Sequence, residues 1–288
     1  IVDDIGTTPF KVLDHGFVRL VEDGLMGNDA AIVQAARVSY GVGTETVRKD
    51  KDLIGYLMEN AHTSPFEMCE IKLHVKMPIF VARQWVRHRT ASLNEYSGRY
   101  SKMTSEFYTP AKERMQQQHS TMKQGSAEEI IPRAQIARSQ MMFLADDAFE
   151  LYENLIHADG HNMARETARI TLPLSTYTEM YWKIDLHNLL GFLRQRMDGH
   201  AQYEIRVFAD AIWKIVDLWV PAVADAFKEH HLDAAKLSRG QLQAVRGILA
   251  GLSHDDACQH LKPRQKAALL AKLVEPAEDD EFQGQLPI

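Results

Sequence analysis

The side chains best suited to chemistry lie close together, in residues 83–100. This stretch holds four arginines, one histidine and one glutamate at the end of an otherwise apolar segment. Guanidinium groups bind phosphates and carbonyl-rimmed heterocycles through paired, charge-assisted hydrogen bonds. The run Ser97-Gly98-Arg99 adds a small-residue turn whose backbone N–H groups can surround an anion. The stretch therefore predicts a site for a phosphorylated or carbonyl-rich ligand.

An arginine-rich helix end also occurs as a plain solvated surface, where each ion pair contributes little stability. If residues 79–86 form a helix, Arg83 and Arg87 lie four apart and share one face. Composition leaves both interpretations open. The order of residue types along the whole stretch favours a binding site.

Residues 87–100 (RHRTASLNEYSGRY) resemble the signature of the flavin-dependent thymidylate synthases, the ThyX family, written RHRxxSxNExSxRY. All nine fixed positions match; they are Arg87, His88, Arg89, Ser92, Asn94, Glu95, Ser97, Arg99 and Tyr100. Residues 62–67, 165–173 and 192–202 resemble three further segments of this family. Together the similar segments cover roughly residues 10–225.

The resemblance implies an enzyme that methylates dUMP to dTMP, using methylenetetrahydrofolate as one-carbon donor, FAD as hydride carrier and NADPH as reductant. It implies catalytic roles for His62 and for Arg196, the latter at the uracil ring. A guanidinium beside the pyrimidine carbonyls would stabilise a ring anion and polarise the C5–C6 bond. The positions matching the dUMP site are Gln84, Arg87, Glu95, Tyr96, Ser97, Gly98, Arg99 and Arg169, the last from a neighbouring subunit.

The same comparison assigns a set of residues to FAD. They are Ser64, Arg87, His88, Arg89, Glu95, Asp185, His187 and Gly191. Some family members have Asn-x-Arg where this chain has Asp185-Leu-His187, and a polar side chain where it has Gly191. Glycine offers no side-chain hydrogen bond and weakens a helix by roughly 1 kcal/mol relative to alanine. Either FAD binds more weakly here, or His187 or Asn188 makes the contact instead.

No nucleophilic cysteine is expected. The cysteine-dependent thymidylate synthases need a reactive thiol, whereas Cys69 falls on the apolar face of a predicted strand, as a small core residue would. Neither Cys69 nor Cys258 has the spacing of a metal ligand or a disulfide framework. Ser97 has no activating His–Asp pair nearby in the sequence, so we expect it to position a ligand.

Composition limits the alternatives. The chain has 288 residues, 45% of them hydrophobic and 25% charged, with a net charge of -6, which indicates a globular protein and disfavours polymeric nucleic acid as a partner. A noncatalytic nucleotide-binding module, a plain flavin oxidoreductase and a structural subunit that has lost its chemistry are the rivals. No apolar run is long enough for a membrane span, and residues 1–10 lack a signal pattern, so we expect a cytoplasmic protein.

Hydrophobic periodicity predicts the elements that must position these residues. Strands are expected over 17–23, 69–77 and 176–184, and a surface loop or insertion over 111–127. Helices are expected over 29–40, 46–60, 79–86, 137–155, 187–197, 205–219 and 239–249. This pattern favours an α+β fold with a twisted, mainly antiparallel sheet flanked by long helices. We expect residues 1–225 to form the enzyme domain and 226–288 a helical extension with an acidic tail over 275–288. The resemblance implies a homotetramer with active sites at subunit interfaces.

Overall fold

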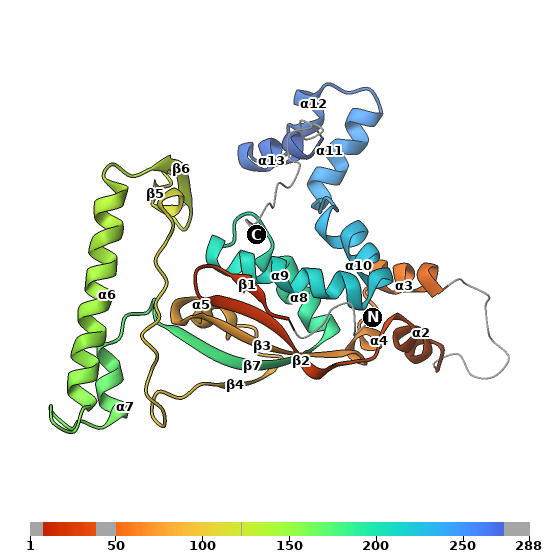
Figure 1. The fold of residues 1–288 in the computed structure, drawn as a ribbon. Helices are drawn as coiled ribbons and strands as arrows, with labels where there is room; N and C mark the ends of the chain where they lie inside the picture. Colours follow the sequence, from red (N-terminus) through yellow and green to blue (C-terminus); the bar gives the residue numbers. More distant parts are fainter. Residues whose placement is uncertain (1–7, 39–49, 122, 274–288) are drawn as a thin grey trace. The chain divides into compact units, whose positions relative to one another are not determined.

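The fold comes from a computed structural model that describes residues 8–38, 50–121 and 123–273 (Figure 1). The chain divides into two compact units, one ending at His230 and the other beginning at His231. The predicted helices over 29–40 and 46–60 appear as α2 (Asp29–Val38) and α3 (Asp50–Glu59). Their remaining residues, and the acidic tail, lie outside the described residues.

The first unit is built on a five-stranded antiparallel sheet of order β1-β2-β3-β7-β4. Its strands are β1 (Phe10–Val12), β2 (Gly16–Met26), β3 (Glu70–Pro78), β7 (Tyr177–Asp185) and β4 (Ser92–Glu95). In the central strand, Ile71, Leu73, Val75 and Met77 are fully buried while the residues between them are not. The α+β class and the antiparallel sheet predicted from the sequence are confirmed.

Helices cover the face of the sheet on which these apolar residues lie (Figure 1). They are α5 (Ile79–Trp85), α8 (Leu186–Arg196) and α9 (Tyr203–Trp219). The short helix α4 (Ser64–Glu67) packs against α8, and α10 (Pro221–Phe227), which a π-helical turn (Lys228–Leu232) follows, packs against α9. Trp85 of α5 packs edge to face on Trp182 of β7, and both contact Phe192 of α8. This aromatic cluster joins α5, which leads into the arginine-rich stretch, to β7 and to α8, which ends at Arg196.

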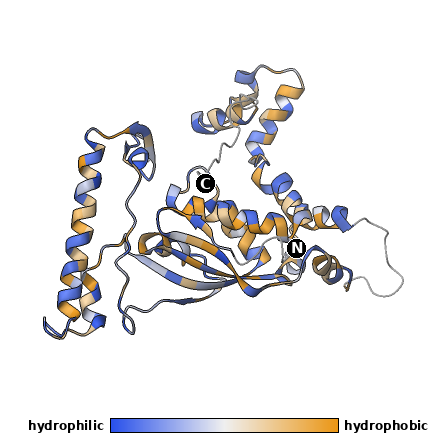
Figure 2. Cartoon of the chain, in the orientation of Figure 1, coloured by the Kyte–Doolittle hydropathy of each residue, from blue (hydrophilic) through white to orange (hydrophobic). Residues whose placement is uncertain are grey.

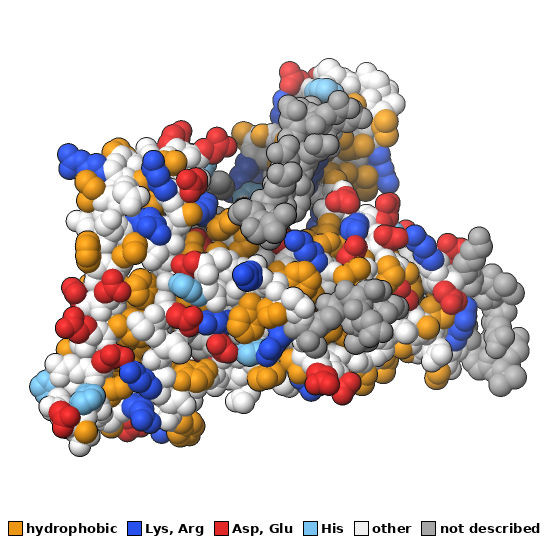
Figure 3. Space-filling view, viewed as in Figure 1, with side chains coloured by type: hydrophobic (Ala, Val, Ile, Leu, Met, Phe, Trp, Pro, Cys, Tyr) orange, Lys and Arg blue, Asp and Glu red, His pale blue; other side chains and the backbone are white. Residues whose placement is uncertain are grey.

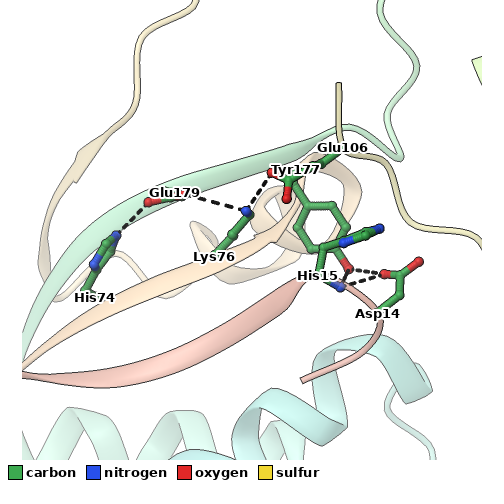
Figure 4. Close-up of polar contacts among 7 residues, drawn as sticks. All are labelled: Asp14, His15, His74, Lys76, Glu106, Tyr177 and Glu179. Carbon is green, nitrogen blue, oxygen red and sulfur yellow. Dashed lines mark hydrogen bonds and ion pairs between the residues drawn. The ribbon is translucent and has the colours of Figure 1, made fainter. Parts of the chain in front are cut away.

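The opposite face of the sheet carries half-buried polar side chains (Figure 4). His74 Nε2 lies 2.9 Å from Glu179 Oε2, and Lys76 Nζ lies 2.6 Å from Glu106 Oε2. The first contact joins β3 to β7, and the second joins β3 to the segment before Phe107. The sheet therefore has one polar face and one apolar face, and the helices cover the apolar one.

Strand β2 is longer than predicted. It passes through Gly24, where the expected strand stops, and its pairing with β3 shifts register between Leu20 and Leu25. A Cβ on Gly24 would lie 2.5 Å from the carbonyl oxygen of Val21 and 2.7 Å from that of Lys72. The glycine therefore permits a β-bulge and does not end the strand.

Residues 111–127, expected as a surface loop or insertion, contain short regular elements. A 3₁₀ turn (Lys112–Arg114) precedes a hairpin of β5 (Gln116–Gln118) and β6 (Ser126–Ile130). Backbone hydrogen bonds hold this hairpin, and a polar run rich in glutamine has no apolar alternation that would reveal it.

The long amphipathic helix is confirmed as α6 (Ala134–Ile156), and α7 (Arg165–Ala168) and a 3₁₀ turn (Arg169–Thr171) pack against it. Its apolar side is only partly covered: Phe143 and Leu144 are each 68% exposed. Figure 2 marks hydrophobic residues along α6, and Figure 3 shows hydrophobic side chains at the surface over this helix. The chain by itself thus leaves an apolar strip open on this helix.

The second unit contains α11 (Arg239–Leu249), α12 (His254–Cys258) and α13 (Pro263–Leu273). Ser238 and Gln241 form the predicted capping box at the start of α11. Ala244, Cys258 and Leu269 form its buried centre. None of the helices among the described residues is long and apolar enough to cross a membrane.

Candidate active site

Arg196 and His88 meet where α8 and the segment after α5 come together. Arg196 Nε donates to His88 Nε2 at 3.0 Å, and Arg196 Nη2 donates to the backbone oxygen of Gln84 at 3.4 Å. Because Nε2 accepts, a neutral His88 ring carries its proton on Nδ1. The aromatic cluster positions both residues, since the His88 ring stands edge-on to Phe192 with ring centres 4.8 Å apart.

Burial lowers the pKa of His88 to about 4, and the Arg196 cation lowers it in the same direction. The imidazole is therefore neutral at physiological pH. Burial also lowers the pKa of Arg196, which has no carboxylate partner in the described part of the chain. The guanidinium is thus a cation held by two acceptors, neither of which neutralises it.

Arg83 and Arg87 do not lie in one helix. Helix α5 ends at Trp85 with Val86 as its C-cap, and the chain then turns as His88 N donates to Trp85 O at 3.0 Å. Arg87 and Arg89 lie beyond the helix and are exposed. Neither forms an ion pair with a carboxylate of the residues that the structure covers.

A turn at Ser97 follows β4. Tyr100 N and Ser101 N both donate to Ser97 O, at 3.1 and 3.0 Å, and Arg99 N lies 3.3 Å from Ser97 Oγ. Gly98 lies close to two side chains, since a Cβ there would be 2.9 Å from Met103 Sδ and 3.3 Å from Arg169 Cδ. Arg169 therefore lies against the Ser97 turn of its own chain, whereas the resemblance implies that it reaches dUMP from a neighbouring subunit.

A weak ion pair borders this turn. Arg99 Nε lies 3.4 Å from Glu166 Oε2, with both side chains more than half exposed, and Arg165 donates to Tyr100 O at 3.0 Å. A solvated pair of this kind contributes little energy, so an incoming phosphate can replace Glu166 at Arg99.

Glu95 and Tyr96 are held at the edge of the sheet. Glu95 lies opposite Met180 in register, and its Oε1 accepts from Thr178 Oγ at 2.8 Å. Tyr96 N donates to Glu179 O at 2.8 Å, and its hydroxyl donates to Lys102 O at 2.6 Å. These bonds set the direction in which the chain enters the Ser97 turn.

His62 and Ser64 lie at the start of α4, which packs against α8. His62 is exposed and stands edge-on to Tyr56, with ring centres 5.7 Å apart. No hydrogen bond among the described residues joins His62 or Ser64 to Arg196. The structure therefore places this pair beside α8 but apart from the Arg196–His88 contact.

Asp185 caps α8. Its side chain accepts from Asn188 N at 2.9 Å and from Asn188 Nδ2 at 2.7 Å. His187 is half-buried in the first turn and makes no hydrogen bond to the described residues, while nothing lies within 4 Å of a Cβ placed on Gly191. Of the two replacement contacts for FAD, Asn188 already serves the cap and His187 is available.

Cys69 is a core residue, as predicted. Its side chain is fully buried, and burial, with the nearby Asp29 carboxylate, raises its pKa to about 11. A thiol with this pKa is almost entirely protonated near neutral pH.

Sequence reasoning missed two residues that contact the site. Gln84 Nε2 donates to Gln202 Oε1, and Gln202 Nε2 donates to Glu204 Oε2. The sequence did carry a signal, because Glu204 precedes Phe208 and Ile212 at steps of four along the apolar side of α9. A carboxylate at such a position is buried and needs polar partners.

The donor set fits anionic ligands. Arg87, Arg89, Arg169 and Arg196 have no carboxylate partner within the described ranges, and Arg99 has only an exposed one. Phosphate, pyrophosphate and pyrimidine carbonyls are ligands that such guanidinium groups bind. A flavin dinucleotide and a nucleotide monophosphate both match this chemistry.

Comparison with known proteins points the same way. The model of the family described as thymidylate synthase complementing protein matches residues 19–222. A flavin-dependent thymidylate synthase of Gluconobacter oxydans is 52% identical over 269 residues, covering 92% of this chain and 88% of the relative. One from Rickettsia bellii is 48% identical over 262 residues, covering 87% and 88%.

Solved structures are also similar. The UMP/dUMP methylase PolB of Streptomyces cacaoi, bound with 5-Br dUMP, superimposes with a TM-score of 0.68 at 30% identity. The match covers 77% of this chain and 98% of that one. The part of the chain that carries the arginines thus shares both sequence and fold with these proteins.

Proposed function

The chain belongs to the family of flavin-dependent thymidylate synthases, and on that premise we propose that it converts dUMP to dTMP with methylenetetrahydrofolate as one-carbon donor, NADPH as reductant and FAD as the carrier of hydride. The observation that carries the proposal is the set of guanidinium groups without carboxylate partners at the end of α8, after α5 and beside the Ser97 turn. These cations suit the two anionic ligands that the reaction requires.

Arg196 is the proposed catalytic residue. Its charge stabilises the negative charge that builds up on the uracil carbonyls as C5 becomes nucleophilic. The neutral His88 ring holds the guanidinium by accepting from Nε, and it neither repels Arg196 strongly nor neutralises it. Ser97, Arg99 and Arg169 take the phosphate of dUMP, and Gln84, Arg87, Glu95, Tyr96 and Gly98 line the rest of its site.

No cysteine takes part in this mechanism. The buried, protonated Cys69 supports that view. Ser97 Oγ has one bond among the described residues, a long one from Arg99 N, and lacks a base. Ser97 therefore positions the phosphate, and activation of the pyrimidine rests on Arg196.

The residues proposed to hold FAD are Ser64, Arg87, His88, Arg89, Glu95, His187 and the helix surface at Gly191. Asp185 acts through the cap that positions His187. His62, exposed beside α4, is proposed as a supporting group at this site.

The site is proposed to be shared between subunits of a homotetramer. The open apolar strip on α6 supports a subunit interface. Mixed tetramers of Arg196→Ala and Arg99→Ala chains should regain activity that each variant lacks; no recovery would contradict a shared site.

The experiment that tests the function is dTMP formation from dUMP, methylenetetrahydrofolate and NADPH, with and without added FAD. Product that requires all four components supports the proposal. A folded protein that binds FAD and makes no dTMP overturns it.

A further inference from the structure

We propose that the buried carboxylate of Glu204 fixes the orientation of the Gln84 side-chain amide, and that Gln84 consequently offers its oxygen to dUMP. Glu204 and Gln202 would thus be positioning residues for substrate recognition. The inference rests on the proposed role of Gln84 at the dUMP site and adds to it the atom that Gln84 presents.

The relay begins at a carboxylate that can only accept hydrogen bonds. Glu204 is 5% exposed, and its Oε1 accepts from the Tyr108 hydroxyl at 3.2 Å. Arg114 Nε lies 3.9 Å from the same oxygen. Burial raises the pKa of Tyr108, and the Glu204 charge raises it further, so the hydroxyl keeps the proton that it donates. The other carboxylate oxygen, Oε2, faces Gln202.

Each amide in the relay is forced into one orientation by the group before it. Gln202 Nε2 donates to Glu204 Oε2 at 2.8 Å, because a carboxylate needs a donor opposite it. This turns Gln202 Oε1 towards Gln84, whose Nε2 donates to it at 2.5 Å. A flipped amide at either position would set two donors or two acceptors against each other.

The relay ends at the side-chain oxygen of Gln84. Gln84 Oε1 has no hydrogen-bond partner among the described residues, and Arg196 Nη2 contacts the backbone oxygen of the same residue. The relay therefore leaves a free side-chain acceptor on the residue whose backbone oxygen Arg196 contacts. A ligand recognised there must bring a donor, and dUMP has two, the 3′-hydroxyl of the sugar and the N3–H of the uracil.

The central variant is Glu204→Gln. The new amide can donate as well as accept, so the orientations of Gln202 and Gln84 are no longer imposed. We expect the KM and the dissociation constant for dUMP to rise roughly tenfold, with kcat within about twofold of the parent protein.

A compensating double variant makes the test specific. In Gln202→Glu combined with Glu204→Gln, the carboxylate sits at 202, accepts from Gln84 and receives a bond from the amide at 204. The affinity for dUMP should return to within about threefold of the parent value. A double variant that binds dUMP no better than Glu204→Gln would overturn the relay.

Tyr108→Phe is the matched control. It removes a buried hydrogen bond to the same carboxylate and leaves the contact between Gln202 and Glu204 in place. We expect a lower Tm and an unchanged KM for dUMP. If Tyr108→Phe raises KM as much as Glu204→Gln does, the effect is general loosening and the relay is refuted.

Two analogues identify the donor. For each analogue, the dissociation constant of Glu204→Gln is divided by that of the parent protein. If the 3′-hydroxyl is the donor, this ratio should fall towards one for 2′,3′-dideoxyuridine monophosphate, which lacks that hydroxyl. If N3–H is the donor, the ratio should fall towards one for 3-methyl-dUMP. A tenfold ratio retained with both analogues would overturn the proposal. Because calorimetry measures dUMP binding without turnover, it tests the relay even if the protein does not catalyse the proposed reaction.

Discussion

Arg196 Nε and His88 Nε2 lie 3.0 Å apart and join residues separated by 108 positions in the chain. A cation and a basic ring tolerate this contact because burial, together with Arg196, lowers the pKa of His88 to about 4. The neutral ring accepts from the guanidinium and fixes its direction. Three elements, α5, β7 and α8, meet around this contact.

Replacing Arg196 with alanine should lower kcat for dTMP formation by about 100-fold or more, since a group that stabilises developing charge is lost. Circular dichroism and Tm should show a folded protein. Arg194→Ala is the matched control, because Arg194 lies in the same last turn of α8, is exposed and has no ion pair in the described structure. Near-normal turnover of the Arg196 variant would refute its catalytic role.

His88 should make stability depend on pH. Its pKa is 6.5 in the unfolded chain and about 4 in the folded one, so between these values the unfolded state binds more protons. Stability is therefore highest above pH 6.5 and falls as the pH drops towards 4, by on the order of 2 kcal/mol after allowance for partial exposure. Urea unfolding of the parent and of His88→Gln at several pH values measures the difference. Parallel curves for the two proteins would contradict the assignment.

Ser97→Ala should retain dTMP formation within about tenfold of the parent, because its hydroxyl makes only one long bond, from Arg99 N at 3.3 Å. The KM for dUMP is expected to rise more than kcat falls. Steady-state kinetics with varied dUMP check this. Complete loss of turnover with dUMP still bound would indicate a serine nucleophile.

Gly191→Ala should stabilise the protein by about 0.5–1 kcal/mol, since Gly191 is helical and nothing lies within 4 Å of the added Cβ. Gly55→Ala in α3, which is equally unobstructed, should give a similar gain. Urea unfolding measures the stability gain of each variant, and a titration with FAD then compares how tightly the two variants bind the cofactor. Weaker FAD binding in Gly191→Ala alone would support the flavin site at α8, and equal binding in both variants would argue against it.

Glu106→Gln should cost about 1 kcal/mol of stability at pH 7, because its charge-assisted bond to the largely buried Lys76 is weakened. Burial acts to raise the pKa of Glu106, but the bond and charge of Lys76, with smaller effects of His15 and Thr104, hold that pKa below the usual 4.5. The contribution is therefore present above the unfolded pKa and lost as the pH falls through the folded one. Thermal unfolding at pH 7 and pH 3 should show the two proteins converging in acid; a constant gap would exclude the ion pair as the cause.

Several features could be predicted from the sequence because they depend on neighbours along the chain. The alternation over β3, the turn from Pro78 into α5 and the capping box at Ser238 follow from the local backbone and side-chain periods. The run RHRTASLNEYSGRY likewise identified the arginines and the turn at Ser97. Residue order by itself determined the family and the α+β class, and it supplied the set of residues that we propose for the site.

Only the tertiary structure decided how these residues meet. The bond from Arg196 to His88, the contact of Gly98 with Arg169 and the chain of amides ending at Glu204 each join distant segments. The bulge at Gly24 and the hairpin at β5 likewise depend on the strand alongside and not on side-chain period. The physical reason is that burial, pKa and hydrogen-bond direction come from groups brought together by packing of sheet and helices, and local periodicity does not encode which groups those are.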